Sequence, residues 1–196
     1  MNAVNYLRWA RFIWWNYKLF ARRLAEVARN VKSILDVGCG NGLLLDELKI
    51  FFPDALIVGI DSSKEMLTVR KQANYILIGK AEHLPFKDGS FDVVTCMYSL
   101  HEFDILAAIE EIYRVLKDDG LLSIKEINCN APVWALSYLK LLLSMFFDKK
   151  TVEGHIKLYQ TFKSPKKLKL ILEKNGFRVV RIDESLLDFI VFCVKS

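Results

Sequence analysis

Short apolar runs alternate along most of this chain with longer segments whose apolar residues recur every three or four positions. The run Phe91–Met97 is nearly all apolar, as in a strand that is buried on both faces of a sheet. The segment Ile105–Leu116 instead carries its apolar residues at helical spacing. This alternation predicts an α/β domain in which helices cover both faces of a mostly parallel sheet.

The predicted strands are Ser33–Gly38, Leu56–Asp61, Tyr75–Gly79, Phe91–Met97, Leu121–Ile127, Phe177–Ile182 and Phe189–Val194. The predicted helices between them are Leu43–Phe51, Lys64–Gln72, Ile105–Leu116 and Pro165–Asn175. Residues 183–188 are too few for a helical crossover, so we expect the last two strands to pair antiparallel near one edge of the sheet.

The chain shows no repeat and no low-complexity linker, and 196 residues fit one domain. We therefore expect a single domain over 1–196, with a helical extension at 1–30, a core at 31–127, a variable insertion at 128–162, and a final helix and hairpin at 163–196. With 53% hydrophobic and 26% charged residues, disorder is not expected.

The charge distribution and the cysteines indicate possible partners and the cellular compartment of the protein. The net charge of +5 is concentrated in the first thirty residues and around 163–169. Such basic helix faces are usually solvated, and they otherwise suit phosphate groups or an anionic membrane. Four scattered cysteines without close pairing argue against a metal site and favour a reducing compartment, so we expect a cytoplasmic protein. The sequence shows neither a signal peptide nor a membrane-spanning run.

A glycine-rich turn follows the first predicted strand. Residues 35–42 read Leu-Asp-Val-Gly-Cys-Gly-Asn-Gly, and the glycines let the backbone turn sharply and approach a ligand where a β-carbon would intrude. Asp61 ends the second strand, where a carboxylate can accept hydrogen bonds from both hydroxyls of a ribose. Together these features indicate a ligand that contains adenosine.

The glycine spacing separates two such ligands. A dinucleotide fingerprint that starts at Gly38 needs glycine or alanine at position 43, where Leu43 stands. Asp36 precedes the turn, where a carboxylate would repel a pyrophosphate but suits the α-ammonium group of a methionine moiety. The sequence therefore predicts S-adenosylmethionine as the cofactor. The alternative is that these residues only build strand-to-helix turns.

Five stretches in this order resemble class I S-adenosylmethionine-dependent methyltransferases, in particular the small-molecule group that includes the ubiquinone and menaquinone biosynthesis enzymes. The stretches are Ile34–Gly42, Val58–Ser62, Ala81–Phe86, Ser90–Val94 and Tyr113–Leu121. The resemblance implies a Rossmann-like three-layer sandwich with a seven-stranded, mostly parallel sheet and an antiparallel strand at its C-terminal end. It implies a transferase that methylates a small-molecule acceptor.

The resemblance also implies roles for matched residues. Asp36 and the Gly38–Gly40 backbone would hold the methionine part, Asp61 the ribose, and Met66 would pack on adenine. Many relatives have an acidic residue where Lys80 stands, and an ammonium group cannot accept a hydrogen bond from adenine. The adenine contact must then come from the Ala81 backbone, from Glu82 or from water, and we expect Ala81 and Glu82 to make it. The expected cofactor site also includes Cys39, Asn41, Ser62 and Met97, which follow or end the first, second and fourth strands.

Methyl transfer from a sulfonium needs alignment and desolvation, and a base only where the acceptor must lose a proton. The candidates for a catalytic base are His101 and Tyr98, which follow the fourth strand. A neutral imidazole accepts a proton near neutral pH. The alternative is that His101 caps the next helix or lines the pocket without titrating.

The segment Ala131–Phe147 lies where this family carries its variable substrate cover. With the aromatic residues between Trp9 and Phe20 it is expected to form a lid over an apolar or aromatic acceptor. The same residues would alternatively pack on the sheet, form a homodimer contact, or touch a membrane surface. Two other functions stay open, an RNA methyltransferase and a cofactor-binding regulatory subunit without turnover. The sequence contains no separate RNA-binding module, so nucleic acid is not the expected partner.

Overall fold

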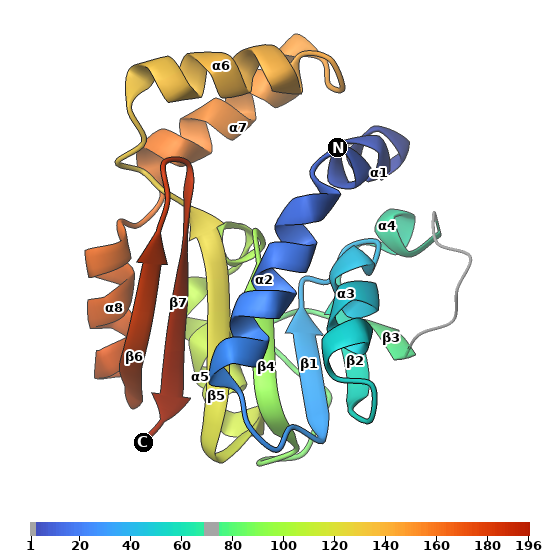
Figure 1. Cartoon of the computed structure of the whole chain (residues 1–196), viewed down its shortest axis with the longest axis vertical. Helices are drawn as coiled ribbons and strands as arrows, with labels where there is room; N and C mark the ends of the chain where they lie inside the picture. The colour runs from blue at the N-terminus through green and yellow to red at the C-terminus, as the bar shows by residue number, and fades with distance from the viewer. Residues whose placement is uncertain (1–2, 69–74) are drawn as a thin grey trace.

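A seven-stranded sheet forms the centre of the computed structural model, which describes residues 3–68 and 75–196. The strand order is β3-β2-β1-β4-β5-β7-β6 (Figure 1). The strands are β1 (Ser33–Val37), β2 (Leu56–Asp61), β3 (Tyr75–Ile78), β4 (Phe91–Met97), β5 (Leu116–Ile127), β6 (Phe177–Glu184) and β7 (Asp188–Lys195). The helices are α1 (Ala3–Phe12), α2 (Trp14–Val27), α3 (Leu43–Phe51), α4 (Lys64–Thr68), α5 (Ile105–Val115), α6 (Val133–Leu143), α7 (Lys149–Thr161) and α8 (Pro165–Lys174), and Leu100–Glu102 form a 3₁₀ turn.

The pairing of the strands confirms the predicted fold class. β1 pairs in parallel with both β2 and β4, and only β7 runs antiparallel to its neighbours β5 and β6. The chain winds outward in opposite directions from β1 and β4. Ligands of such sheets bind beyond the carboxyl ends of the strands at this reversal point.

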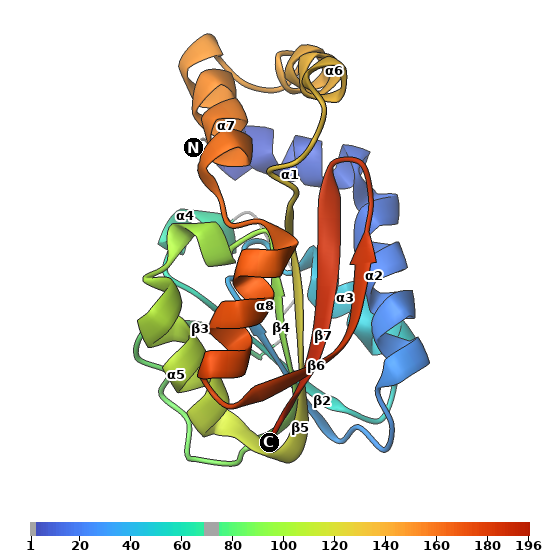
Figure 2. The same cartoon turned by 90° about the vertical axis from the view of Figure 1, so that its left-hand side faces the viewer.

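Two apolar layers cover the faces of the sheet. On one face, α2 and α3 bury residues such as Phe20 and Leu45, and on the other, α5 and α8 bury Ile109 and Leu172. Figure 2 shows the two helix layers on opposite sides of the strands. The central strands are therefore buried from both sides, which explains the nearly unbroken apolar run in β4, whereas the edge strand β3 is largely exposed.

Helices α1, α6 and α7 lie beyond the carboxyl ends of the central strands (Figure 1). A third apolar cluster there joins Leu139, Leu143, Phe147 and Val152, and Trp9 of α1 packs against it. Residues 128–162 therefore contribute two helices that pack with α1 beyond this end of the sheet, whereas Tyr17 and Phe20 of α2 are buried against the sheet. Among the helices of the described residues, none has both the length and the apolar character that crossing a bilayer requires.

The structure differs from the predicted elements in several places, and it adds α6 and α7 within 128–162, for which no helix bounds were predicted. The N-terminal extension contains two helices, because the chain breaks at Ile13, which has φ −96° and ψ 21°. β5 begins at Leu116, where the predicted helix was expected to end, and its pairing with β4 shifts register near Phe91. The predicted helix Lys64–Gln72 is seen as far as Thr68, and its remainder lies outside the described residues.

Candidate active site

The turn after β1 places backbone N–H groups at the end of the next strand. The amides of Gly38 and Cys39 donate to the Ile60 carbonyl oxygen at 2.8 and 3.1 Å. Gly38 and Gly40 have φ +74° and +52°, in the left-handed region that favours glycine. A β-carbon at position 38 would collide with the Ser99 side chain, so this turn requires glycine there.

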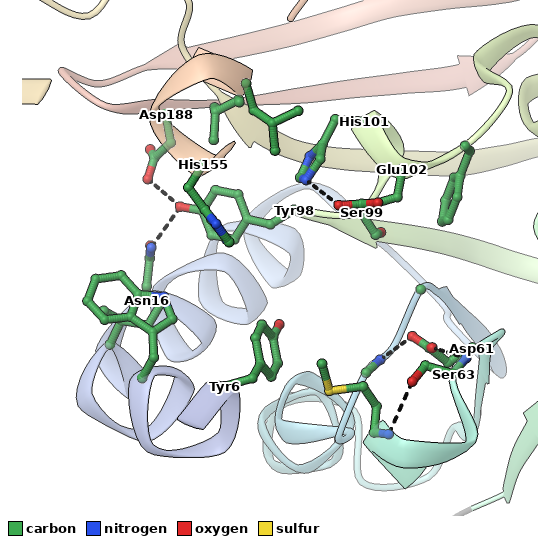
Figure 3. Close-up of a pocket in the computed structure, with 18 of the residues that line it drawn as sticks. Tyr6, Asn16, Asp61, Ser63, Tyr98, Ser99, His101, Glu102, His155 and Asp188 are labelled. Atoms are coloured by element: carbon green, nitrogen blue, oxygen red, sulfur yellow. Dashed lines mark hydrogen bonds and ion pairs between the residues drawn. The ribbon is translucent and has the colours of Figure 1, made fainter. Parts of the chain in front are cut away.

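Asp61 connects this turn to the start of α4. One carboxylate oxygen accepts from the Gly40 amide at 2.7 Å, and the other accepts from the Ser63 amide at 2.8 Å. Each carboxylate oxygen can accept a second hydrogen bond. Figure 3 shows Asp61 and Ser63 on one side of a cavity, across from Tyr98, His101 and Glu102.

The cavity has a volume of about 1410 Å³ and runs from the glycine turn to α1, α6 and α7. A single small ligand usually occupies roughly 300–1000 Å³, so this space accommodates a nucleoside cofactor and a second molecule. It is lined by nine of the predicted site residues: Gly38, Gly40, Asp61, Ser62, Met66, Ala81, Glu82, Tyr98 and His101.

Four predicted site residues lie outside the lining. Cys39 packs toward Gly59, Asn41 accepts from the Leu43 amide at 3.3 Å at the start of α3, and Met97 is 7% exposed. Asp36 is 2% exposed and accepts a hydrogen bond from the Thr95 hydroxyl at 2.8 Å. Cys39, Asn41 and Met97 support the turn from behind, Asp36 lies buried beneath it, and the backbone and Asp61 face the cavity.

The carboxyl group of Asp36 has a raised pKa. Burial raises its pKa to about 7, an effect that the hydrogen bond from Thr95 opposes and the nearby Asp61 carboxylate strengthens. Near neutral pH, Asp36 is thus divided between its neutral and ionised forms. A cation brought to this end of the cavity would favour the ionised form.

Glu82 is tied to the protein in the loop after β3. Its carboxylate accepts a hydrogen bond from the backbone amide of Asp104 at 3.0 Å. Because Asp104 is the N-cap residue of α5, this bond joins the loop to that helix. Lys80 and His83 form an isolated bridge that closes a tight turn around Ala81. The predicted contact of Glu82 with adenine therefore has to share a carboxylate that already anchors the backbone.

Tyr98, which follows β4, is part of a network that joins α2, β5 and β7. Its hydroxyl donates to Asp188 at 2.6 Å and accepts from the Asn16 amide group at 2.8 Å. The buried Lys125 ammonium donates to the Asn16 side-chain oxygen at 2.7 Å and lies 3.2 Å from the Asp188 carboxylate. Burial and the Asp188 charge raise the Tyr98 pKa well above its ordinary value, so its hydroxyl keeps its proton.

His101 is held between two glutamates at the cavity wall. Its Nδ1 lies 3.0 and 3.1 Å from the two carboxylate oxygens of the fully buried Glu126, and its Nε2 lies 3.5 Å from Glu102. Burial favours the neutral ring, but the hydrogen bonds and charges of both glutamates outweigh it and raise the pKa to about 9. The ring is therefore an imidazolium at neutral pH in the unliganded protein.

Known proteins resemble this chain in both sequence and fold. The family described as methyltransferase domain matches residues 35–124. A demethylmenaquinone methyltransferase of Staphylococcus aureus is 34% identical over 186 residues, which cover 85% of this chain and 77% of the relative. The chain is a class I S-adenosylmethionine-dependent methyltransferase.

Two further comparisons extend this family assignment. An uncharacterized protein of Methanocaldococcus jannaschii is 32% identical over 84% of this chain and 71% of its own length. A solved Thermotoga maritima structure, described as a S-adenosylmethionine-dependent methyltransferase and possible histamine N-methyltransferase, has a TM-score of 0.71 at 21% identity. It covers 97% of this chain and 94% of its own, and at that identity it supports the fold alone.

The cavity of this methyltransferase fits S-adenosylmethionine, the cofactor of its family. The Asp61 oxygens suit a ribose diol, and Gly38 and Gly40 bring backbone close to the cavity without a side chain. The bound cofactor supplies a methyl group on a positively charged sulfur, which leaves as a neutral thioether. Among the described residues, no group of three or more histidine, cysteine or acidic side chains could hold a metal ion.

Three residues beside the cavity of this methyltransferase were not among the site residues predicted from the sequence. Tyr6 of α1 lies over the glycine turn, Asn16 of α2 bonds to Tyr98, and Glu126 of β5 holds His101. Only Glu126 left a signal in the sequence. It stands beside Lys125 inside an apolar run, and ionisable residues are seldom fully buried without partners.

Proposed function

We propose that this methyltransferase acts on a small apolar or aromatic molecule that lies under the lid formed by α1, α6 and α7. The observation that carries the proposal is the wall of the cavity beyond the glycine turn. There it is lined by Trp9 and Phe12 of α1, Leu139 and Leu143 of α6, and Tyr159 of α7. Such a wall stabilises an apolar acceptor by burial.

The cofactor is assigned to the other end of the cavity. In this proposal Asp61 accepts from the ribose hydroxyls, the Gly38–Gly40 backbone and Asp36 hold the methionine part, and Met66, Ala81 and Glu82 enclose adenine. Ser62 belongs to the ribose end, while Cys39, Asn41 and Met97 act by supporting the turn rather than by direct contact. The protein mainly aligns the acceptor with the sulfonium methyl group and excludes water, which is how most of the rate gain arises in such a displacement.

His101 is proposed as the base that accepts a proton from the acceptor, with Glu126 orienting its ring. The imidazole must first lose the proton that the two glutamates stabilise, so the activity of this base increases toward alkaline pH. Tyr98 is proposed as a positioning residue, because its hydroxyl donates to Asp188 and resists ionisation. It fixes α2 against the sheet beside the acceptor.

We place the proposed enzyme in the cytoplasm, in contact with a membrane surface. Cys96 and Cys193 are buried free thiols, which suits a reducing cytoplasm. The basic and aromatic N-terminal helices suit contact with a membrane surface better than contact with nucleic acid. A methyl acceptor that dissolves in lipid would be found at such a surface.

Product analysis tests the proposed acceptor class. The full-length protein is incubated with S-adenosylmethionine carrying a deuterated methyl group and with separate lipid and aqueous extracts, and products that gain one labelled methyl are identified by mass. We expect labelled products in the lipid extract and none with Asp61→Asn. Labelling only of highly charged metabolites would reject the apolar acceptor, and labelling only of added tRNA or rRNA would identify an RNA methyltransferase. Cofactor binding by calorimetry without any labelled product would instead favour a regulatory subunit.

A further inference from the structure

Helix α6 exposes an apolar face to solvent. Trp134, Tyr138, Leu141 and Met145 follow one another at helical spacing, and each is between 60% and 66% exposed. The opposite side of the same segment is buried in the lid through Leu139 and Leu143. α6 is therefore apolar on both sides, although only its inner side has a partner within the described part of the chain.

The C-terminal end of this exposed face lies next to α1, which lines the cavity. Phe146, next to Met145, packs on Phe12 of α1 with ring centroids 5.3 Å apart. Phe12 and Trp15 line the cavity and are 50% and 58% exposed. We call Phe12, Trp15, Trp134, Tyr138, Leu141 and Met145 the lid patch.

Cations accompany the lid patch, and carboxylates are missing from the same segments. Residues 1–25 contain five arginines and lysines, and residues 128–147 contain Lys140, with no aspartate or glutamate in either range. Arg8, Arg11, Lys18 and Lys140 are exposed. Aromatic side chains among exposed cations are the composition that binds the boundary between anionic headgroups and acyl chains.

The charge pattern also decides between a membrane and a second copy of the chain. In a two-fold dimer the same patch meets itself, so the arginines and lysines of both copies would be brought together. No carboxylate in these two segments would compensate that repulsion. An anionic bilayer instead offers apolar chains to the aromatic residues and phosphate groups to the cations.

We propose that the lid patch docks this methyltransferase on the surface of an anionic lipid bilayer, with the cavity mouth toward the lipid. The enzyme lies on the membrane without crossing it, and an apolar acceptor passes from the acyl region between α1 and α6 into the cavity. This route deepens the proposed function and rests on it for the nature of the acceptor. The docking itself needs neither acceptor nor cofactor.

Vesicle binding tests the docking directly. The full-length protein is sedimented with sucrose-loaded vesicles of phosphatidylcholine, either alone or with roughly one third phosphatidylglycerol. We expect binding to the anionic vesicles that weakens at high salt. The double substitution Trp134→Ser with Leu141→Ser is expected to weaken it at least about tenfold, because it removes two large inserted side chains. Arg8→Glu with Arg11→Glu should abolish the preference for anionic lipid.

A matched control uses Ile50→Ser, which removes an apolar side chain of similar exposure from the end of α3 that points away from the glycine turn. It should bind vesicles as the wild type does. Equal vesicle binding by the wild type and the Trp134/Leu141 variant, or none by the wild type, would overturn the proposal. A wild-type dimer that this variant converts to monomer in light scattering would assign the patch to self-association instead. Cofactor calorimetry and methylation of an acceptor dispersed in detergent are measured on the same samples, so that lost docking is distinguished from lost activity.

Discussion

At the scale of single residues, Glu126 controls the charge of the proposed base. Its buried carboxylate stabilises the His101 imidazolium, so we expect kcat/KM of the wild type to increase with pH, with its inflection near pH 9 and a plateau above it. Glu126→Gln keeps a hydrogen-bond acceptor but removes the charge, which lowers the His101 pKa and moves the inflection to lower pH. The measurement is the pH profile of kcat/KM for both proteins.

His101→Gln is the control for this profile. It should lower kcat/KM by about a hundredfold at alkaline pH and remove the inflection, as expected when general-base catalysis is lost. A wild-type profile that decreases as pH rises through 9 would contradict the base and indicate an imidazolium that donates to the acceptor. An unchanged profile in His101→Gln would remove the residue from the chemistry altogether.

Asp36 offers a second test at this scale. Its pKa of about 7 in the free protein should decrease when the cationic methionine end of the cofactor binds, because an opposite charge favours the carboxylate. Cofactor binding at about pH 6.5 should therefore release part of a proton, and binding well above pH 7 should not. Calorimetry in buffers of different ionisation enthalpy measures this release. Asp36→Asn should abolish it, and an equal release by that variant would place the proton elsewhere.

At the scale of elements, a buried ion pair joins β5 to β7, and its lysine also holds the N-terminal extension against the sheet. Lys125 of β5 is paired with Asp188 of β7 and hydrogen-bonded to Asn16 of α2. Asp188→Ala leaves the buried ammonium without its counter-charge, so we expect the free energy of unfolding to decrease by about 3 kcal/mol in urea denaturation. Asp118→Ala, which removes the fully exposed partner of Lys195, should leave the midpoint unchanged.

The same pair gives the wild type a sensitivity to acid. Burial alone would raise the Asp188 pKa, but the Lys125 charge and the hydrogen bond from Tyr98 together hold it below the ordinary value. A lowered carboxyl pKa stabilises the fold above the unfolded value, and this stabilisation is lost as pH falls through the folded value. Asp188→Ala should therefore lose less stability than the wild type over that acid range. Parallel acid curves would contradict this assignment.

At the scale of the whole molecule, the cofactor joins elements from across the sheet and should stabilise all of them together. At a concentration one hundred times the dissociation constant, S-adenosylmethionine should add about 2.7 kcal/mol to the free energy of unfolding. For a chain of this size that raises the melting temperature by roughly 5–10 °C. Asp61→Asn should largely abolish the rise, since it replaces an acceptor of ribose hydroxyls with an amide. Asp54→Asn, an exposed acid before β2, should keep it.

The elements and the cofactor turn followed from local patterns in the sequence. The buried strands produced apolar runs, the helices produced a 3.6-residue period, and the turn after β1 required glycine wherever the backbone enters the left-handed region. Asp61 was found because successive parallel strands end at the same edge of the sheet. Ile13 was missed because no glycine or proline marks the break between α1 and α2.

Only the tertiary structure decided the environment of the side chains. The Tyr98 network joins residues 16, 98, 125 and 188, and His101 meets Glu126 from another strand, so no local pattern contains either contact. The charge of His101 and of Asp36 likewise depends on burial and on neighbours that the fold supplies. The sequence by itself determined the fold class and the methyl donor, because those depend on short-range patterns. The part of the cavity proposed for the acceptor and the lid patch depend on packing between segments that are distant in sequence. Only the folded chain places those segments together.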